Sequence, residues 1–483
     1  MFDTKESSAA KILDRVTAGA RAENRGAGTR LAAIGDLDTL RSREHAEREL
    51  WTIDNAAATV AEVAAALGIE RGLAANYLWD ARALRDRLPK VGALLCSGEI
   101  SALTFHILVY RTDLITDPEI MAAVDTALAE RIPRCPRLTR HRLCGLIDAI
   151  IARADRDAVR RRREHHTDRH IVITPFIGGG AEIHGQVTAV AGHALDARLD
   201  ALAATVCEHD PRTRDQRRAD AITALAAAAD RMACHCGRPD CPVSRRPAAS
   251  PVLIHVIADQ GALAGGAATA SVVGSDAIIP PELLAELARE ARTRTLHHPA
   301  DSPPEAGYTP SRALADFVRC RDLTCRFPGC DVPATECDID HVVPYRNGGT
   351  THASNLSCKC RTHHLLKTFL AWRDRQLPDG TLIWTAPSGQ TYVTLPGSAL
   401  LFPNLCAPTG ELAPPPPPTA DPSPTDRTLK MPTRRHTRAE GHARYVAAER
   451  RRNRARRLAQ PPPIDPWAGT APDYDDGSDP PPF

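Results

Sequence analysis

Cysteine and histidine residues crowd into one short stretch of the chain, and this clustering limits its fold more than any other feature. Two pairs have the short spacings of metal ligands, Cys325-x4-Cys330 and Cys360-x2-His363. Three thiolates and one imidazole form the ligand set of a closed, tetrahedral zinc site. We therefore expect this stretch to fold around a structural Zn²⁺ ion that fastens two separate segments of chain.

The membership of this ligand set is open in one respect. Cys337 and Cys358 lie in the same stretch, and either can replace one of the four ligands. The Pro328-Gly329 turn favours a knuckle in which two thiolates converge on one ion. A helix that begins near Arg361 would carry His363 to the ion from the other side.

Four side chains inside this frame suit the hydrolysis of a phosphodiester: Asp340, His341, Asn355 and His364. Asp340 and a neutral His364 can bind Mg²⁺, Mn²⁺ or a similar divalent ion, which would polarise the scissile phosphate. His341 follows Asp340 directly and points to the opposite face of a strand, so it can serve as general base. Asn355 can tie the intervening loop and thereby hold His341 in its productive tautomer.

These motifs resemble those of the HNH, or ββα-metal, endonucleases. The resemblance covers about forty-five residues and rests on Asp340-His341, then Asn355-Leu356, then the His363-His364 pair. It implies a hairpin bearing the Asp-His pair packed on a helix bearing the last metal ligand. It also implies Asp340 and His364 as ligands and His341 as base, and places Arg361 and Lys367 where phosphate contacts are expected.

The whole chain further resembles HNH-signature proteins of high-GC Gram-positive bacteria (actinobacteria), including mycobacterial repeat-family proteins. The matching stretches include Leu84 to Pro89, Cys207 to Arg212 with Arg218 to Ala221, and Asp379 to Thr381 through Trp384 to Gly389. In that group a long helical domain of unknown function precedes the nuclease module. The resemblance therefore implies an architecture for most of this chain.

Helical spacing of apolar residues, a few β-like runs and proline-rich breaks predict an α+β chain that is mainly α. We expect the following parts: a partly helical leader (1–30), a mainly helical domain of unknown function with a small sheet (31–295), a linker (296–312), the zinc-stabilised ββα HNH module with a C-terminal hairpin (313–402), and a disordered tail rich in Pro and Arg (403–483) with a basic helix near 434–458.

A second group of thiols lies outside this module, at Cys234, Cys236 and Cys241. A fourth ligand would have to be His235, which is cramped by its neighbours in the sequence, or a remote residue such as Cys207 or His209. A thiol-rich surface loop is the preferred interpretation, and a second metal site is the alternative.

Overall charge gives no reason to invoke nucleic acid, because 61 basic and 59 acidic residues leave a net charge of +2. Two local runs can contact phosphate: the arginines of 160–163, for which a solvated face is the preferred interpretation, and the arginines of the basic helix. The charged start of the chain and the lack of a long apolar run predict a cytoplasmic protein without membrane contact. The 14 cysteines are then expected to be thiols and metal ligands.

Together these features predict a metal-dependent HNH endonuclease that cuts double-stranded DNA, with Zn²⁺ as structural ion and Mg²⁺ or Mn²⁺ as catalytic ion. No protein partner can be named from the sequence. The alternative is a catalytically silent, zinc-stabilised nucleic-acid-binding or scaffold protein.

Overall fold

The computed structural model describes residues 3–135, 138–159, 170–176, 180–187, 189–241, 256–263, 270–272, 292–300, 302–410 and 431–459, with a few single residues between them. Contacts divide the chain into two units whose segments alternate along the sequence. The helical unit comprises residues 1–50, 76–161 and 434–483, and the mixed unit comprises 51–75 and 162–433. This grouping differs from the predicted division, which follows the chain without interleaving.

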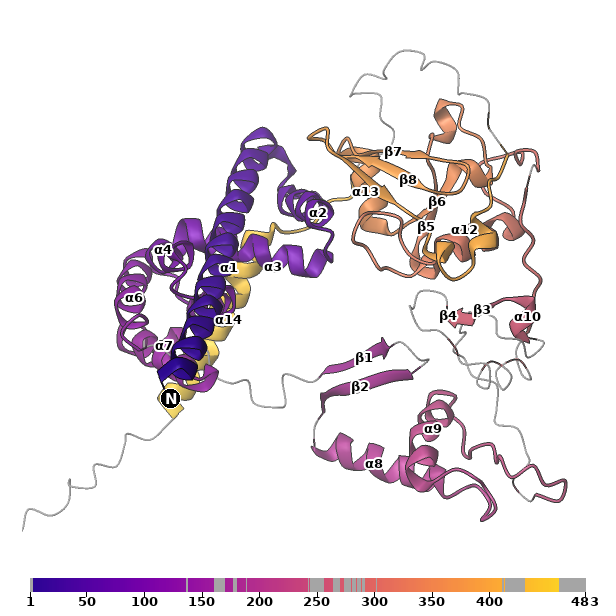
Figure 1. The fold of residues 1–483 in the computed structure, drawn as a ribbon, viewed down its shortest axis with the longest axis horizontal. Coiled ribbons are helices and arrows are strands. Elements are labelled where there is room, and N and C mark those ends of the chain that lie inside the picture. Colours follow the sequence, from indigo (N-terminus) through magenta and orange to yellow (C-terminus); the bar gives the residue numbers. More distant parts are fainter. Residues whose placement is uncertain are drawn as a thin grey trace, which may run out of the picture. The chain divides into compact units, whose positions relative to one another are not determined.

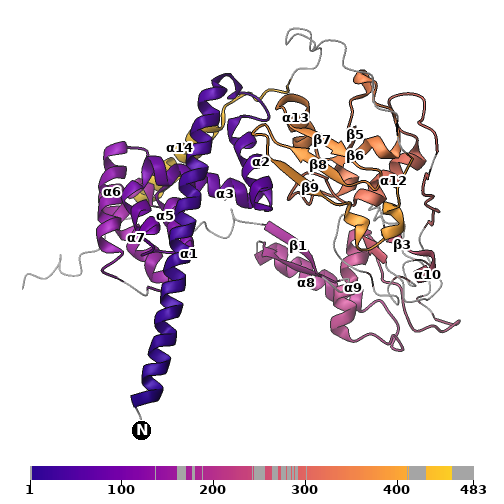
Figure 2. The same cartoon turned by 45° about the horizontal axis from the view of Figure 1, so that its top comes forward.

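The helical unit contains long helices and short helical turns (Figures 1 and 2). Its first helix, α1, crosses the boundary predicted at residue 30. In chain order the elements are α1 (Asp3–Glu44), η1 (Ala46–Arg48), the end of α3 (Arg71–Arg82), the π-helical turn η2 (Ala83–Arg87), α4 (Pro89–Ser97), α5 (Ala102–Thr112), α6 (Pro118–Arg131), α7 (Arg140–Ala154), η3 (Arg156–Ala158) and α14 (Arg438–Ala459).

Local signals in the sequence explain where several of these helices begin. The side chains of Ser101, Asp117 and Thr139 accept hydrogen bonds from backbone amides in the first turns of α5, α6 and α7. α4 begins at Pro89, whose missing amide hydrogen costs nothing in a first turn. Leucine, valine and phenylalanine side chains then fill the core, among them Leu88, Val91, Leu95, Phe105, Leu108 and Leu128.

The last helix of this unit, α14, is the predicted basic helix, and it starts at a capping box. Thr437 and Glu440 exchange hydrogen bonds between side chain and backbone amide, 3.1 Å each. Its Val446 and Asn453 are buried, and Asn453 Nδ2 donates to the carbonyl oxygen of Asp157 at 2.9 Å. α14 is therefore packed into the helical unit rather than separate from it.

The mixed unit contains small antiparallel sheets and shorter helices, so the chain as a whole has the predicted mainly α character with α+β elements. Its elements are α2 (Asn55–Leu67), β1 (His170–Phe176) paired with β2 (Gly180–Gln186), α8 (Ala189–Ala203), α9 (Arg214–Ala226), β3 (Val256–Ala258) paired with β4 (Ala270–Val272), and α10 (Gln260–Leu263).

The Cys/His stretch folds into a strand pair, a helix and a further sheet. β5 pairs antiparallel with β6, with Asp340 opposite Ser357, and α13 follows β6 directly. β8 pairs with β9 as the predicted hairpin, and β7 extends that sheet. The elements are α12 (Arg312–Asp322), η4 (Ala334–Glu336), β5 (Asp338–His341), η5 (Tyr345–Asn347), η6 (Ala353–Asn355), β6 (Leu356–Lys359), α13 (Arg361–Phe369), β7 (Arg373–Gln376), β8 (Leu382–Thr385), β9 (Thr391–Thr394), η7 (Gly397–Ala399) and η8 (Pro403–Cys406).

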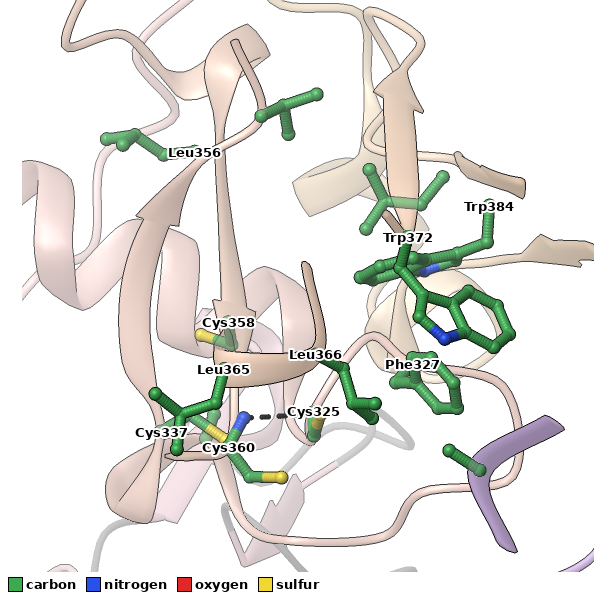
Figure 3. Packing of buried hydrophobic residues seen from close by; sticks show 14 of the residues in the cluster. Cys325, Phe327, Cys337, Leu356, Cys358, Cys360, Leu365, Leu366, Trp372 and Trp384 are labelled. Carbon is green, nitrogen blue, oxygen red and sulfur yellow. Dashed lines mark hydrogen bonds between the residues drawn. The ribbon is translucent and has the colours of Figure 1, made fainter. Parts of the chain in front are cut away.

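One hydrophobic core holds this part together, and Figure 3 shows its central side chains. Phe327 lies between the indoles of Trp372 and Trp384, with ring centroids 4.8 and 5.2 Å away. All three side chains are almost fully buried. Aromatic pairs in edge-to-face arrangements add to the free energy gained from burial. The core thereby joins the knuckle that carries the first two cysteines to the three-stranded sheet.

Helix α2 belongs to the same core, although more than 200 residues separate it from the rest. Ile53, Ala58, Ala61 and Ala65 pack in one cluster with Leu314 and Phe317 of α12 and with the tryptophans. The helix is fixed by Asp54, whose carboxylate accepts the Ala57 amide at 2.9 Å. The sequence gives no sign of this pairing, because an alanine-rich amphipathic helix can pack on many surfaces.

No helix among the described residues combines the length and apolarity needed to span a bilayer.

Candidate metal centre and active site

The structure brings together the four predicted zinc ligands. Ligand atoms of Cys325, Cys330, Cys360 and His363 all lie within 4.8 Å of one another. His363 Nδ1 is 3.4 Å from Cys325 Sγ and 3.2 Å from Cys360 Sγ. A tetrahedral zinc ion about 2.3 Å from sulfur and about 2.0 Å from nitrogen sets sulfur–nitrogen distances of about 3.5 Å. The donor set and its spacing therefore fit a structural zinc ion.

Backbone geometry places the two segments that supply these ligands. Gly329 adopts a φ of +70° between the first two cysteines, a conformation that side chains disfavour. Cys360 caps the N-terminus of α13, and its amide donates to Cys325 Sγ at 3.3 Å, drawn as a dashed line in Figure 3. His363 lies in the first turn of α13 and stacks on Phe327 with centroids 3.9 Å apart. The hydrophobic core thus orients the imidazole.

The two alternative cysteines take other positions. Cys358 is fully buried, and its thiol points to the carbonyl oxygen of Val318 at 4.0 Å. Burial raises the pKa of this thiol. Cys337 is also buried in the hydrophobic core, and its thiol lies 3.7 Å from the carbonyl oxygen of Val332. The group of four contains neither.

A second polar site lies where β5 faces α13. Asp340 Oδ1 is 3.4 Å from His364 Nε2, and Asp338 Oδ2 is 2.9 Å from His364 Nδ1. Two ligand atoms about 2.1 Å from one ion lie roughly 3.0 to 3.4 Å apart. Asp340 and His364 therefore fit a divalent ion. Asp338 was missed by the sequence reasoning, although its position two residues before Asp340 on a strand indicates the same face.

A buried network of charges fixes Asp340. Its Oδ2 atom lies 3.1 Å from Lys359 Nζ and 2.8 Å from Lys367 Nζ, and Asp374 lies 2.9 Å from both ammonium groups. Burial opposes ionisation of Asp340, but Lys359, Lys367 and His364 outweigh it and hold the pKa of this carboxyl well below its ordinary value. One carboxylate oxygen is thus anchored while the other faces His364.

The two predicted phosphate contacts differ in position. Arg361 is 68% exposed and lies 3.7 Å from Asp338. Lys367 is only 11% exposed, because its ammonium also donates to the carbonyl oxygens of His341 and Val342 at 2.6 and 3.0 Å. The structure therefore gives Lys367 an internal role in place of the predicted contact, and Arg361 keeps a side chain that solvent can reach.

His341 lies on the opposite face of β5 and is 3% exposed. Its Nε2 is 2.9 Å from Thr351 Oγ1, and the Thr351 hydroxyl in turn donates to the carbonyl oxygen of Gly307 at 2.6 Å. A hydroxyl has one hydrogen, so Nε2 must be the donor to Thr351, which leaves Nδ1 as the basic nitrogen. Burial lowers the pKa of His341 and favours this neutral form.

Asn355 ties the loop between β5 and β6, as predicted, but it does not orient the imidazole. Its Oδ1 accepts from the Val343 amide at 2.8 Å, and its Nδ2 donates to the carbonyl oxygens of Val343 and Thr350 at 3.1 and 2.8 Å. Thr351 Oγ1, rather than Asn355, accepts the hydrogen bond that His341 Nε2 donates. No motif marks a threonine in such a loop, so the sequence could not identify it.

The segment predicted as a linker forms part of this site. The Glu305 amide donates to the carbonyl oxygen of Thr351 at 2.9 Å. The Tyr308 ring stacks on the His341 imidazole with centroids 5.1 Å apart, and Tyr345 meets both rings edge-on. Residues around 305–308 therefore cover the candidate base.

The two predicted basic regions have different outcomes. The arginines of 160–163 lie outside the described residues. In α14, Arg450 pairs with Asp155 at 2.6 Å and Arg457 pairs with Asp157 at 3.0 Å, both within the helical unit. Arg451, Arg452 and Arg454 are exposed. Some arginines of the predicted basic helix therefore form ion pairs within the helical unit, and others are exposed to solvent.

Comparisons with known proteins identify relatives without assigned functions. A family model described as "Domain of unknown function (DUF222)" matches residues 18–322. The chain is similar to "Uncharacterized protein Rv3776" of Mycobacterium tuberculosis (strain ATCC 25618 / H37Rv), with 42% identity covering 93% of this chain and 91% of that protein. It is also similar to "Uncharacterized protein MT2160" of Mycobacterium tuberculosis (strain CDC 1551 / Oshkosh), with 43% identity covering 90% and 86%. No solved structure matches.

Proposed function

The chain belongs to the DUF222 family, and we propose that in this member the ββα segment after the matched residues is an HNH endonuclease module that hydrolyses phosphodiester bonds in double-stranded DNA. One observation carries the proposal. The pairing of β5 with β6 and the start of α13 put Asp340 Oδ1 3.4 Å from His364 Nε2, with His341 on the other face of the same strand. Because successive side chains of a strand point to opposite faces, Asp340 and the base His341 lie on opposite faces of β5.

Each residue has a defined task in this mechanism. Asp340 and His364 would hold a divalent ion such as Mg²⁺ or Mn²⁺, which when bound polarises the scissile phosphate and stabilises the leaving 3′ oxygen. His341 Nδ1 accepts the proton of the attacking water as the water oxygen forms its bond to phosphorus and the bond to the 3′ oxygen breaks. Lys359 and Lys367 keep Asp340 ionised and oriented. Exposed Arg361 is placed to contact a phosphate oxygen.

The zinc ligands support the same proposal indirectly. Cys360 and His363 lie in or next to the first turn of α13, and His364 follows in that turn. An ion held by Cys325, Cys330, Cys360 and His363 would fix this turn against the knuckle, and with it the position of His364. The structural ion would thus perform no chemistry of its own but would hold the first turn of α13 to the knuckle.

A second candidate function is favoured by the cover over His341. The imidazole is almost fully buried, and Tyr308 stacks directly on it. In this alternative the module is a zinc-stabilised nucleic-acid-binding or scaffold element that has lost cleavage. Exposed arginines of α14 and Arg361 would then supply phosphate contacts without hydrolysis.

The test is plasmid cleavage by the purified full-length protein with Mg²⁺ or Mn²⁺. We expect nicked or linear DNA, and no cutting by His341→Ala at unchanged zinc content. His297→Ala is the matched control, because His297 is an exposed histidine outside the site, and it should cut at the wild-type rate. Cutting by His341→Ala at the rate of the wild type would exclude the mechanism. DNA binding without cutting by the wild type would favour the second candidate.

A further inference from the structure

Four cysteines outside the proposed nuclease module converge at one point of the mixed unit. The Sγ atoms of Cys207, Cys234, Cys236 and Cys241 all lie within 4.8 Å of one another, and those of Cys207 and Cys234 are 3.4 Å apart. All four are free thiols. We propose that they bind a second structural zinc ion as a tetrathiolate site, which holds helices α8 and α9 together.

The fourth ligand of this group, which the sequence leaves open, is Cys207. Three of the thiols come from the loop after α9, whereas Cys207 follows α8 and is separated from Cys234 by 26 intervening residues in the printed sequence. Neither His235 nor His209 belongs to the group. Four sulfurs around one zinc ion about 2.3 Å from each lie about 3.8 Å apart, and no two sulfurs of this cluster are more than 4.8 Å apart.

Hydrogen bonds connect the two ligand-bearing loops without any help from the thiols. The Asp210 carboxylate accepts from the His235 amide at 2.9 Å and from the Arg212 guanidinium at 2.9 and 3.0 Å. Arg212 also donates to the carbonyl oxygen of Ala233 at 2.8 Å. The loops on either side of the cluster are thus held in register, so that the ligands are preorganised.

The last two cysteines form a knuckle. Gly237 has a φ of +65°, and the Cys241 amide donates to the carbonyl oxygen of Arg238 at 3.2 Å. The chain therefore reverses between Cys236 and Cys241, and both thiols turn to the same side. This is the arrangement that the Pro328-Gly329 turn provides for Cys325 and Cys330 in the first centre.

The hydrophobic core beside this cluster is small, so a bound metal ion would add needed stability. The apolar core shared by α8 and α9 has few large side chains, its buried members being Leu202, Val206, Ala221, Ala224, Ala227, Ala229 and Met232. Alanines bury little apolar area, and small cores commonly need a metal or disulfides for stability. Zinc bound by four thiolates supplies folding free energy directly. Four sulfur ligands favour zinc over the oxygen-preferring Mg²⁺ or Mn²⁺.

Metal analysis of the full-length protein tests the proposal. We expect two equivalents of zinc in the wild type and one in Cys236→Ser. Cys325→Ser should also retain one, and the double variant none. Cys96→Ser is the matched control, because Cys96 is an exposed cysteine of the helical unit, and it should retain two. Equal zinc content in the wild type and Cys236→Ser, or iron in place of the second zinc, would overturn the proposal.

A measurement on the unmodified protein covers the case in which the variants fail to fold. The rate of alkylation of each cysteine is followed by peptide mass spectrometry before and after removal of zinc by a chelator. We expect alkylation of Cys207, Cys234, Cys236 and Cys241 to become at least about tenfold faster without zinc. Equal rates, or a Cys207–Cys234 disulfide, would contradict the site. Neither result depends on whether the module cuts DNA.

Discussion

Thr351 determines which nitrogen of His341 can accept a proton. Its hydroxyl hydrogen is used by the carbonyl oxygen of Gly307, so the oxygen can only accept from His341 Nε2. The basic nitrogen is therefore selected by a residue ten positions away in the loop. A general base with the wrong tautomer would present a hydrogen instead of a lone pair to the attacking water.

A substitution at this threonine tests the assignment. We expect Thr351→Val to reduce kcat for DNA cleavage about 10- to 100-fold, the range typical for the loss of a residue that orients a reacting group. Thr351→Ser keeps the hydroxyl and should restore most of the rate. The measurement is kcat with both variants at wild-type zinc content. A valine variant as fast as the serine variant would show that the hydroxyl does not orient His341.

At the residue scale, the sequence predicted the side chains whose chemistry is visible in their type and spacing. The candidate metal ligands follow from two short Cys and His spacings, and their grouping is confirmed. Thr351, Tyr308 and Asp374 were not predicted, because hydroxyl, aromatic and carboxylate groups occur throughout the chain. Only the fold brings these three next to His341 and the lysines.

The chain just after helix α2 contacts the turn between Cys325 and Cys330 at Gly329. A Cβ atom on Gly329 would lie 2.5 Å from the carbonyl oxygen of Ile69, which follows the end of α2. The glycine is thus required both for its positive φ and for the close approach of another segment. The knuckle that holds Cys325 and Cys330 is therefore in direct contact with a segment from the first quarter of the chain.

Two alanine substitutions separate these requirements. Gly329→Ala should lower the stability of the mixed unit by about 2 to 5 kcal/mol, since a left-handed alanine costs about 1 to 2 kcal/mol and an overpacked contact about 1 to 3 kcal/mol. Gly389→Ala, at a φ of +86° with nothing within 4 Å of its Cβ, should cost only about 1 to 2 kcal/mol. Thermal unfolding midpoints compare them. Equal losses would mean that the contact with Ile69 contributes nothing.

At the element scale, prediction succeeded where local signals are strong. β8 and β9 form the predicted C-terminal hairpin, and α14 ends one residue after its predicted range although it begins four residues later than predicted. The segment predicted as a linker packs on the candidate site through Glu305 and Tyr308, which the sequence did not indicate. Proline-rich composition indicates a break in regular structure, and it says nothing about whether the irregular segment packs on a neighbour.

The interleaving of the two units is the main feature of the whole molecule. The match to the DUF222 family ends at Asp322, the last residue of α12, yet Leu314, Phe317 and Val318 of that helix lie in the core of the proposed nuclease module. The family region and the module therefore share a hydrophobic core. Hydropathy patterns along the sequence could not reveal this, because they show that a helix buries one face but not which partner covers it.

Production of fragments tests this shared core. We expect residues 292–433 alone to unfold at a lower temperature than the same segment joined by a flexible linker to residues 51–75. The isolated fragment exposes the surface that Ile53, Ala58, Ala61 and Ala65 cover in the full chain. The control joins the segment to residues 51–75 with Ala61→Glu, which should remove the gain. Identical midpoints for all three proteins would show that α2 does not stabilise the module.

The antiparallel bridge between Trp51 and Thr433 has a consequence for synthesis on the ribosome. Thr52 donates to the carbonyl oxygen of Pro432 at 2.8 Å, and Arg434 donates to that of Leu50 at 2.7 Å. Domains commonly fold one after another as the chain emerges. Here α2 can bury its apolar face only after the tryptophans and Met431 of its core have been translated. The helical unit that contains α1 also includes α14, which is translated late. Both units therefore finish folding together after nearly the whole chain has left the ribosome, and their early helices need protection from aggregation until then.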